Sequence, residues 1–300
     1  MLKKSIDVDV LCVGHACYDL VFSVEKHPES DEKIFADDLV SCGGGPAANA
    51  AIAIAKLGLK SAFSGYLGLD LYGEMHLQEF IDQQVNTQLV VRGSSPTPLS
   101  TVLVKPDGKR ALVNYKGSTK ALSVEAIDFS SISAKSILFD GHEPHLSLKL
   151  ARQARERGVP TVLDAGSLHE GTEKLINQVD YLVASEKFAC QFAGEVKTAL
   201  TQLAKIAPAV VITLGEKGLI WQRGEEVGDM PAIQVDVYDT TGAGDAFHGA
   251  FAAAISNNMD WLEVLKYSSV AGTLCCTRMG ARQGLPDKNE HQKLFLSVYC

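Results

Sequence analysis

Short runs of apolar residues recur along the chain, each bounded by polar or turn-forming residues. Their short length and their content of Val, Ile and Leu are typical of buried strands that carry apolar side chains on both faces. Strands are predicted at residues 8–14, 61–66, 136–140, 160–164, 181–184 and 209–214.

Longer stretches with helical spacing lie between these runs. Helices are predicted at residues 47–57, 145–157, 171–178, 195–206 and 246–255. Gly58 and Gly158 directly follow the first two and favour helix ends there. The alternation of strand and helix predicts an α/β fold with a doubly wound, mostly parallel sheet.

Two stretches, residues 20–42 and 97–120, interrupt this rhythm. The second alternates apolar and polar residues on both sides of residues 106–108 (PDG), a pattern that predicts a hairpin. We expect both stretches to form a small β-structure at one edge of the main sheet, suited to serve as a lid. An ordinary surface hairpin is the alternative. The composition does not shift along the chain, so residues 1–300 are predicted to form one domain.

Charge and composition exclude several classes of protein. The net charge is −8 and no basic tract is present, so the long-range field would repel a nucleic-acid backbone and no nucleic-acid partner is expected. No apolar run approaches the length of a membrane span, so no membrane partner is expected. The seven Cys residues show neither a disulfide framework nor a metal-ligand spacing with His. These features predict a cytoplasmic protein.

Residues 239–247 (DTTGAGDAF) are the strongest chemical signal in the sequence. A glycine-rich turn that opens a helix leaves backbone N–H groups unpaired at the positive end of the helix dipole, which makes an anion hole. Asp245 lies in this turn. One alternative is a carboxylate that only stabilises the helix dipole, but this does not explain the two glycines before it. A base beside an anion hole suits phosphoryl transfer to a hydroxyl.

Residues 43–49 (GGGPAAN) form a second glycine-rich segment, before a predicted helix. The segment also fits the dinucleotide pattern G-x-G-x-x-A, but residues 29–38 before it are charged and are not a buried strand, which disfavours an oxidoreductase. A close turn packed under the helix is the structural alternative. Glycines allow a ligand to approach the backbone, and Asn49 offers both a donor and an acceptor to a hydroxyl.

The sequence contains neither a Walker loop nor the motifs of the protein kinases, so a nucleotide would have to be bound in another way. The turn at residues 213–218 (TLGEKG) directly follows a predicted strand and is a candidate nucleotide contact. A simple turn is the alternative.

Together these segments resemble the ribokinase-like (PfkB) family of carbohydrate kinases over nearly the whole chain, with residues 239–247 as the most specific match. The resemblance implies a Rossmann-like α/β domain with a β-lid. It also implies ATP and Mg²⁺ as cofactors and transfer of the γ-phosphoryl group of ATP to a hydroxyl of a small sugar. By position, Asp245 is then the general base, and the anion hole is formed by Gly242, Ala243 and Gly244.

The same resemblance places the ligands. The residues that would contact sugar hydroxyls are Asp19, Gly44, Gly45 and Asn49, although Asp19 taken alone is equally consistent with a turn residue. The residues that would line the nucleotide are Ser185, Thr213, Gly215 and Gly218. The residues expected beside a monovalent cation such as K⁺ are Asp239 and Thr241.

One segment departs from the family pattern. Many members carry an Asn-x-x-Glu motif that organises Mg²⁺ through water, whereas this chain has residues 185–188 (SEKF), in which Glu186 is the candidate substitute. Residues 163–166 (LDAG) and 276–282 (CTRMGAR) are closer to the ketohexokinase and sulfofructose kinase branch than to ribokinase itself.

Sugar specificity is expected to come from the lid hairpin and from the end of the strand at 136–140. The candidate contacts are Asn114, His142 and Glu143. The basic residues of the lid would favour a phosphorylated or sulfonated sugar, or they form only a solvated face. They are Lys33, Lys105, Lys109, Arg110 and Lys116.

Two other functions remain as alternatives to a sugar kinase. A nucleoside kinase would need a larger apolar pocket beside the lid. A catalytically silent sugar-binding regulator would have no need for a base, so the intact Asp245 argues against it. Lids of this type pair between two chains in the family, so the resemblance also implies a homodimer.

Overall fold

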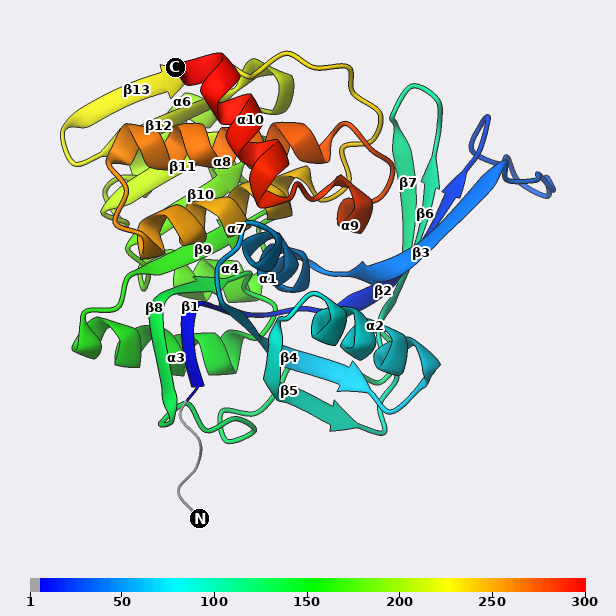
Figure 1. The fold of residues 1–300 in the computed structure, drawn as a ribbon, viewed down its shortest axis with the longest axis horizontal. Helices are drawn as coiled ribbons and strands as arrows, with labels where there is room; N and C mark the ends of the chain where they lie inside the picture. Colours follow the sequence, from blue (N-terminus) through cyan, green and yellow to red (C-terminus); the bar gives the residue numbers. More distant parts are fainter. Residues whose placement is uncertain (1–5) are drawn as a thin grey trace.

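The main sheet combines the predicted strands. The computed structural model describes residues 6–300, and within them this sheet has nine strands in the order β13-β12-β11-β10-β9-β8-β1-β4-β5 (Figure 1). Along the chain they are β1 (Ile6–Val13), β4 (Ser61–Gly68), β5 (Asn86–Gly93), β8 (Ile132–Phe139), β9 (Thr161–Ala165), β10 (Tyr181–Ser185), β11 (Ala209–Thr213), β12 (Leu219–Arg223) and β13 (Glu226–Met230). Each predicted strand coincides with one of these.

The pairing of the strands is parallel from β5 through to β11. Beyond β11, the strands β12 and β13 continue the sheet as an antiparallel hairpin. Strand β9 is buried along its whole length, as expected for a strand covered by helices on both faces. The prediction of a doubly wound, mostly parallel α/β sheet is confirmed.

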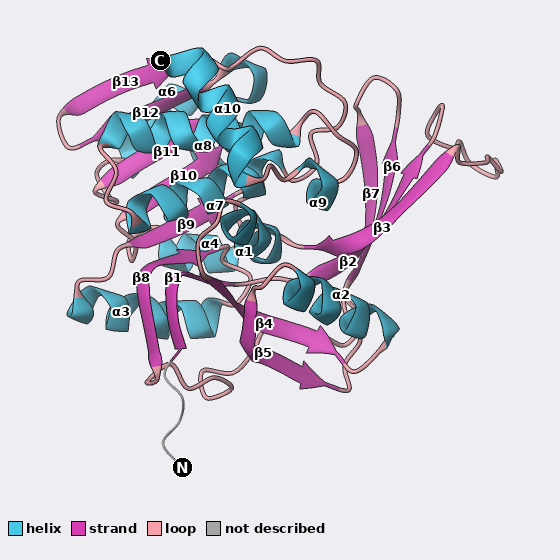
Figure 2. Cartoon of the chain, in the orientation of Figure 1, coloured by secondary structure: helices cyan, strands magenta, loops and turns pink. Residues whose placement is uncertain are grey.

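Helices cover both faces of the main sheet (Figure 2). One apolar core joins the sheet to α1 (Pro46–Lys56), α2 (Leu71–Asp82), α7 (Ala243–Ser256) and α8 (Trp261–Cys275). The other core joins the opposite face to α3 (Pro144–Arg157), α4 (Glu170–Leu175), α5 (Glu186–Ala193) and α6 (Val196–Leu203). The short helix α9 (Ala281–Gly284) and the last helix α10 (Lys288–Tyr299) follow α8.

Small side chains allow α1 and α7 to lie against each other. A Cβ atom at Gly249 of α7 would come within 2.9 Å of the carbonyl oxygen of Ala50 in α1, so a side chain at this position would separate the helices. The remainder of α7 is rich in Ala and buried from Ala246 to its last residue. This close approach brings the first turns of the two helices together, although they lie far apart in the sequence.

A second sheet projects to one side of the main sheet (Figure 1). Its order is β3-β2-β6-β7, from the strands β2 (Cys17–Ser23), β3 (Asp38–Gly44), β6 (Leu99–Val104) and β7 (Arg110–Tyr115). These strands occupy the two stretches that interrupt the α/β rhythm of the sequence, and β6 and β7 form the hairpin that was predicted around residues 106–108. Strand β3 leads directly into α1, so this sheet is attached to the glycine-rich segment.

Within the described part of the chain, no helix is both long and apolar enough to cross a lipid bilayer.

Candidate active site

The glycine-rich turn at residue 242 starts helix α7. Gly242 precedes the helix with φ of 79°, in the left-handed region where a side chain is strained, and a Cβ there would also lie 2.5 Å from the Cβ of Ala281. Ala243 and Gly244 are the first residues of the helix, so their N–H groups have no partner within α7, and the N–H of Ala243 donates to the carbonyl oxygen of Thr240 at 3.3 Å. The predicted anion-hole residues therefore lie at a helix N-terminus.

Asp245 meets Asn49 across the junction of α7 and α1. The Nδ2 atom of Asn49 donates a hydrogen bond of 2.6 Å to Oδ2 of Asp245. Burial raises the pKa of the Asp245 carboxyl, while the hydrogen bond from Asn49 and the positive charge of Arg110 lower it. Asn49 itself is buried, with 3% of its surface exposed.

A second buried carboxylate, Asp19 on β2, lies beside the same segment. The thiol of Cys17 donates to its Oδ1 at 3.1 Å. A Cβ at Gly44 would lie 2.1 Å from Asp19 Oδ2, so any side chain there would displace the Asp19 carboxylate. Burial raises the pKa of Asp19, and the negative charge of Asp245 adds to the rise. The structure thus groups Asp19 and Gly44 near Asp245, as the sequence predicts.

Asp140, just after β8, is a residue whose role the sequence analysis missed. Its carboxylate accepts backbone N–H bonds from His15 at 2.7 Å, Ala47 at 3.2 Å and His142 at 2.9 Å. It therefore fixes the start of α1 relative to the end of β8. An acidic residue directly after a buried apolar strand is the signal that could have identified it.

The predicted specificity residues lie in two places. His142 stacks on His169 with ring centroids 4.7 Å apart, and Glu143 accepts a backbone hydrogen bond of 2.6 Å from Leu122. Burial raises the pKa of Glu143 to about 7. Both residues line a small hollow together with Lys116, which follows β7. Asn114 is on β7 and its side chain is exposed.

The predicted nucleotide contacts lie at the carboxyl ends of two neighbouring strands. Ser185 ends β10 and is paired in register with Thr213, which ends β11. Beyond Thr213 a single 3₁₀ turn (Gly215–Lys217) follows, and Gly218 closes it with φ of 90°. Ser185 Oγ also accepts a hydrogen bond from the N–H of Phe188 at 3.0 Å and caps α5.

Glu186, the candidate for organising Mg²⁺, is the first residue of α5, next to this group. Its Oε1 atom lies 3.4 Å from the ammonium of Lys217 in the 3₁₀ turn. A carboxylate at the carboxyl edge of the sheet has the donor chemistry that Mg²⁺ prefers. Within residues 6–300, no group of three or more His, Cys, Asp or Glu side chains is arranged to hold a metal ion.

Asp239, predicted beside a monovalent cation, is fully buried. Its Oδ1 accepts from the N–H of Thr241 at 2.9 Å and from the hydroxyl of Thr241 at 2.7 Å, and its Oδ2 accepts from the N–H of Gly280 at 2.7 Å. The same hydroxyl accepts a hydrogen bond of 2.8 Å from Arg110 on β7. The second sheet therefore extends a guanidinium to the turn that starts α7.

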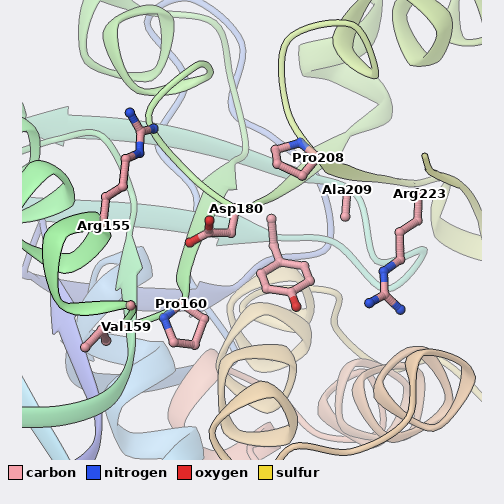
Figure 3. A pocket seen from close by; sticks show the side chains of 9 residues that line it. Arg155, Val159, Pro160, Asp180, Pro208, Ala209 and Arg223 are labelled. Atoms are coloured by element: carbon pink, nitrogen blue, oxygen red, sulfur yellow. The ribbon is translucent and has the colours of Figure 1, made fainter.

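A further hollow of about 380 Å³ lies at the opposite ends of the strands (Figure 3). It is lined by residues just before β9, β10 and β11, including Pro160, Asp180 and Pro208. Ligands of open α/β sheets bind outside the carboxyl ends of the strands, so this hollow is not the candidate active site.

Comparison with known proteins identifies the class. The pfkB family of carbohydrate kinases matches residues 7–288, and the chain belongs to this family. It is 28% identical to a ribokinase of Lactococcus lactis over 286 residues, covering 94% of this chain and 95% of the relative. It is 30% identical to fructokinase-2 of Zea mays over 287 residues, covering 85% and 86%.

Solved structures agree with this assignment. A ribokinase from Thermotoga maritima superposes with a TM-score of 0.85 at 26% identity, covering 97% of this chain and 99% of that one. The ribokinase of Arabidopsis thaliana in complex with ribose and ATP superposes with a TM-score of 0.82 at 26% identity, with the same coverage. The protein is thus a carbohydrate kinase with a ribokinase-like fold. These relatives are ribokinases and a fructokinase, so placement in the ketohexokinase and sulfofructose kinase branch stays a prediction.

Proposed function

We propose that this kinase transfers the γ-phosphoryl group of ATP to a hydroxyl of a small sugar, with Asp245 as the general base. The observation that carries the proposal is the position of Asp245 in the first turn of α7, hydrogen-bonded to Asn49 and next to the N–H groups of residues 242–244. A base and an anion-binding turn at one point are what phosphoryl transfer to a hydroxyl requires.

In this reaction the acceptor hydroxyl loses its proton to the base and gains the phosphoryl group from ATP. The carboxylate of Asp245 takes the proton of the acceptor hydroxyl as its oxygen forms a bond to the γ-phosphorus. The bond from this phosphorus to the bridging oxygen breaks, and ADP leaves. Burial makes Asp245 a stronger base by raising its pKa towards neutrality. The N–H groups of residues 242–244 hold the charge of the transferred group.

The acceptor is proposed to bind between β2 and the start of α1. Asn49 uses Nδ2 for Asp245, while its Oδ1 is buried and has no hydrogen-bond partner among residues 6–300. A buried acceptor of this kind is costly unless a donor such as a sugar hydroxyl reaches it. Asp19 supplies a second acceptor, and Gly44 and Gly45 allow close approach of the ligand. On the other side, we propose that His142, Glu143 and Asn114 distinguish between sugars.

The nucleotide is proposed to lie along the carboxyl ends of β10 and β11, against Ser185, Thr213, Gly215 and Gly218. The Arabidopsis ribokinase complexed with ribose and ATP supports this choice of ligands. Mg²⁺ binds to few protein groups and mainly to phosphates and water, so the single carboxylate of Glu186 is sufficient to orient it. When bound, the ion neutralises phosphate charge.

A monovalent cation such as K⁺ is proposed beside Asp239 and Thr241. The carboxylate of Asp239 is buried, and the hydrogen-bond partners described for it carry no positive charge. A cation placed there would offset the cost of burying this group.

The second sheet is proposed to act as a lid over the acceptor, because Arg110 on β7 already contacts the turn that starts α7. Its edge strand β7 exposes 50% of Leu112 and 70% of Val113. An exposed apolar edge strand is a site for pairing. We therefore propose that a second copy of the chain covers it, which sedimentation of the protein at several concentrations would test.

The proposed activity is tested by measuring ADP release with Mg-ATP, with and without K⁺, over a panel of ketoses, aldoses, their phosphates and nucleosides. We expect one class of sugar to give a strong signal. Release only with nucleosides would assign a nucleoside kinase. Silence over the whole panel, with sugars still raising the melting temperature, would instead indicate a sugar-binding regulator.

A further inference from the structure

Arg282, on the short helix α9 near the end of the chain, reaches into the proposed acceptor site. Its side chain is only 9% exposed. Its Nε atom donates to the carbonyl oxygen of Gly43 at 2.7 Å, and its Nη1 atom donates to the carbonyl oxygen of Ala48 at 3.0 Å. These two carbonyl groups belong to the glycine-rich segment itself: Gly43 is its first residue and Ala48 directly precedes Asn49. One guanidinium therefore contacts the segment at both ends.

Helix α2 completes the surroundings of the guanidinium. The Nη2 atom of Arg282 lies 2.7 Å from Nε2 of His76, on α2. Because a guanidinium can only donate hydrogen bonds, the imidazole accepts and is neutral. Burial, together with the charge of Arg282, lowers the pKa of His76 and favours this neutral form. Glu79 lies 3.6 Å from Nε of Arg282, and its two carboxylate oxygens accept from the N–H of Gly43 at 3.0 and 2.9 Å.

Gly43 is therefore fixed through both of its backbone polar groups. Arg282 binds its carbonyl oxygen, and Glu79 binds its N–H group. There is no free space at this position, since a Cβ there would lie 2.4 Å from Cδ2 of His76. A backbone fixed in this way cannot shift without breaking charge-assisted hydrogen bonds.

The residues just before Arg282 contact the other half of the site. The N–H of Gly280 donates to Asp239, the residue that also binds Thr241. Ala281 occupies the space that a side chain on Gly242 would need. Gly280 and Ala281 thus touch the anion-hole turn, and the Arg282 side chain touches the acceptor segment.

We propose that Arg282 is a positioning residue that holds the acceptor segment, residues 43–49, in register with the anion-hole turn, so that the sugar hydroxyl meets Asp245. This assignment rests on the proposed phosphorylation of a sugar. Among the described residues, the hydrogen bonds of the Arg282 side chain go to Gly43, Ala48 and His76, not to Asp245 or the predicted nucleotide residues. Burial raises the pKa of Asp245, and the positive charge of Arg282 lowers it. The loss of Arg282 should therefore weaken acceptor use and leave nucleotide binding unchanged.

Arg278 provides a matched control four residues earlier in the same segment. It is exposed, and it pairs with Glu290 at the surface. Replacing it also removes one positive charge from this part of the chain, but it does not touch residues 43–49.

The experiment compares Arg282→Gln, Arg282→Lys and Arg278→Gln with the unchanged enzyme. Arg282→Gln removes the two charge-assisted hydrogen bonds to residues 43–49, along with the one to His76, so we expect the acceptor KM to rise about 30-fold or more. We expect the ATP KM and the calorimetric ADP affinity to change by less than about 2-fold. Arg282→Lys keeps the charge but not the planar set of donors, so its acceptor KM should lie between those of Arg282→Gln and the unchanged enzyme. Arg278→Gln should match the unchanged enzyme.

The proposal is overturned if Arg282→Gln leaves the acceptor KM unchanged, or if it weakens sugar and nucleotide equally, because either result indicates only a stabilising role. If Arg282→Gln fails to fold, the acceptor KM and the ATP KM of Arg282→Lys and Glu79→Gln are compared instead, and the same outcomes support or overturn the proposal. An unchanged enzyme that phosphorylates no sugar would instead contradict the proposed function itself, so the two failures are distinguishable.

Discussion

Asn49 and Asp245, 196 positions apart in the chain, share a hydrogen bond of 2.6 Å at the junction of α1 and α7. One side chain comes from the acceptor segment and the other from the anion-hole turn. Since the bond joins an amide donor to a carboxylate, it favours the ionised form of Asp245, which is the form that a base needs. The contact therefore links the binding of the acceptor to the strength of the base.

Asn49→Ala should shift the pH dependence of kcat. The hydrogen bond from Asn49 lowers the pKa of Asp245 against the opposing effect of burial, so its removal should raise that pKa. Because the base acts when deprotonated, the acidic limb of the kcat profile should move to higher pH. The acceptor KM should also rise. Asn289→Ala, at an exposed position on α10, serves as the control, and an unmoved acidic limb would contradict the assigned contact.

Arg110→Gln should lower kcat more than it raises the acceptor KM. The guanidinium lies 2.8 Å from the hydroxyl of Thr241 and its charge reaches Asp245, so it is placed to stabilise charge on the transferred phosphoryl group. We expect kcat to fall about 10-fold to 100-fold. Lys109→Gln removes a neighbouring charge that is 77% exposed and should have little effect. Equal kcat values for the two variants would show that Arg110 does not stabilise the transferred phosphoryl group.

Glu143→Gln should stabilise the protein at pH 8 more than at pH 5. Burial raises the pKa of Glu143 from 4.5 to about 7, so the folded state favours the protonated form. The stability of the unchanged protein is then lost progressively as pH rises from about 4.5 to about 7, by up to about 3 kcal/mol. Glutamine has no such cost. The midpoints of urea unfolding at both pH values test this, with the exposed Glu125→Gln as control. A pH-independent difference would contradict it.

Removal of Mg²⁺ with EDTA should abolish turnover, and Mg²⁺ added back should restore it. If Glu186 orients the ion, Glu186→Gln should raise the Mg²⁺ concentration for half-maximal activity about 10-fold, the size of effect typical of groups that orient a metal through water. The control is Glu216→Gln, at an exposed position in the 3₁₀ turn. Identical Mg²⁺ requirements in the two variants would exclude Glu186 from this role.

The sequence predicts six strands of the main sheet because each carries a short apolar run and helical stretches separate these runs. It does not predict β5, β12 or β13, whose residues mix apolar side chains with polar or charged ones. In β13 (Glu226–Met230), Glu226, Val227 and Asp229 are exposed. The hairpin of β6 and β7 could be predicted, because alternating side chains and a PDG turn are local signals.

The two glycine-rich segments of the site could also be predicted, since a turn into a helix is a local feature of the sequence. The side chains that join them could not. Arg282 binds Gly43 over a separation of 239 positions, and Arg110 binds Thr241 over 131. An isolated arginine has no spacing that would indicate such a partner, so these contacts emerge only from the folded chain.

The central claim, that Asp245 is the base of a sugar kinase, is tested most directly by the turnover of Asp245→Asn at saturating Mg-ATP and sugar. The amide keeps the size of the side chain and cannot take the proton. We expect kcat to fall about 10³-fold, while the calorimetric affinity for ADP stays within about 2-fold of that of the unchanged enzyme. A kcat near that of the unchanged enzyme, with the same sugar as acceptor, would contradict the account.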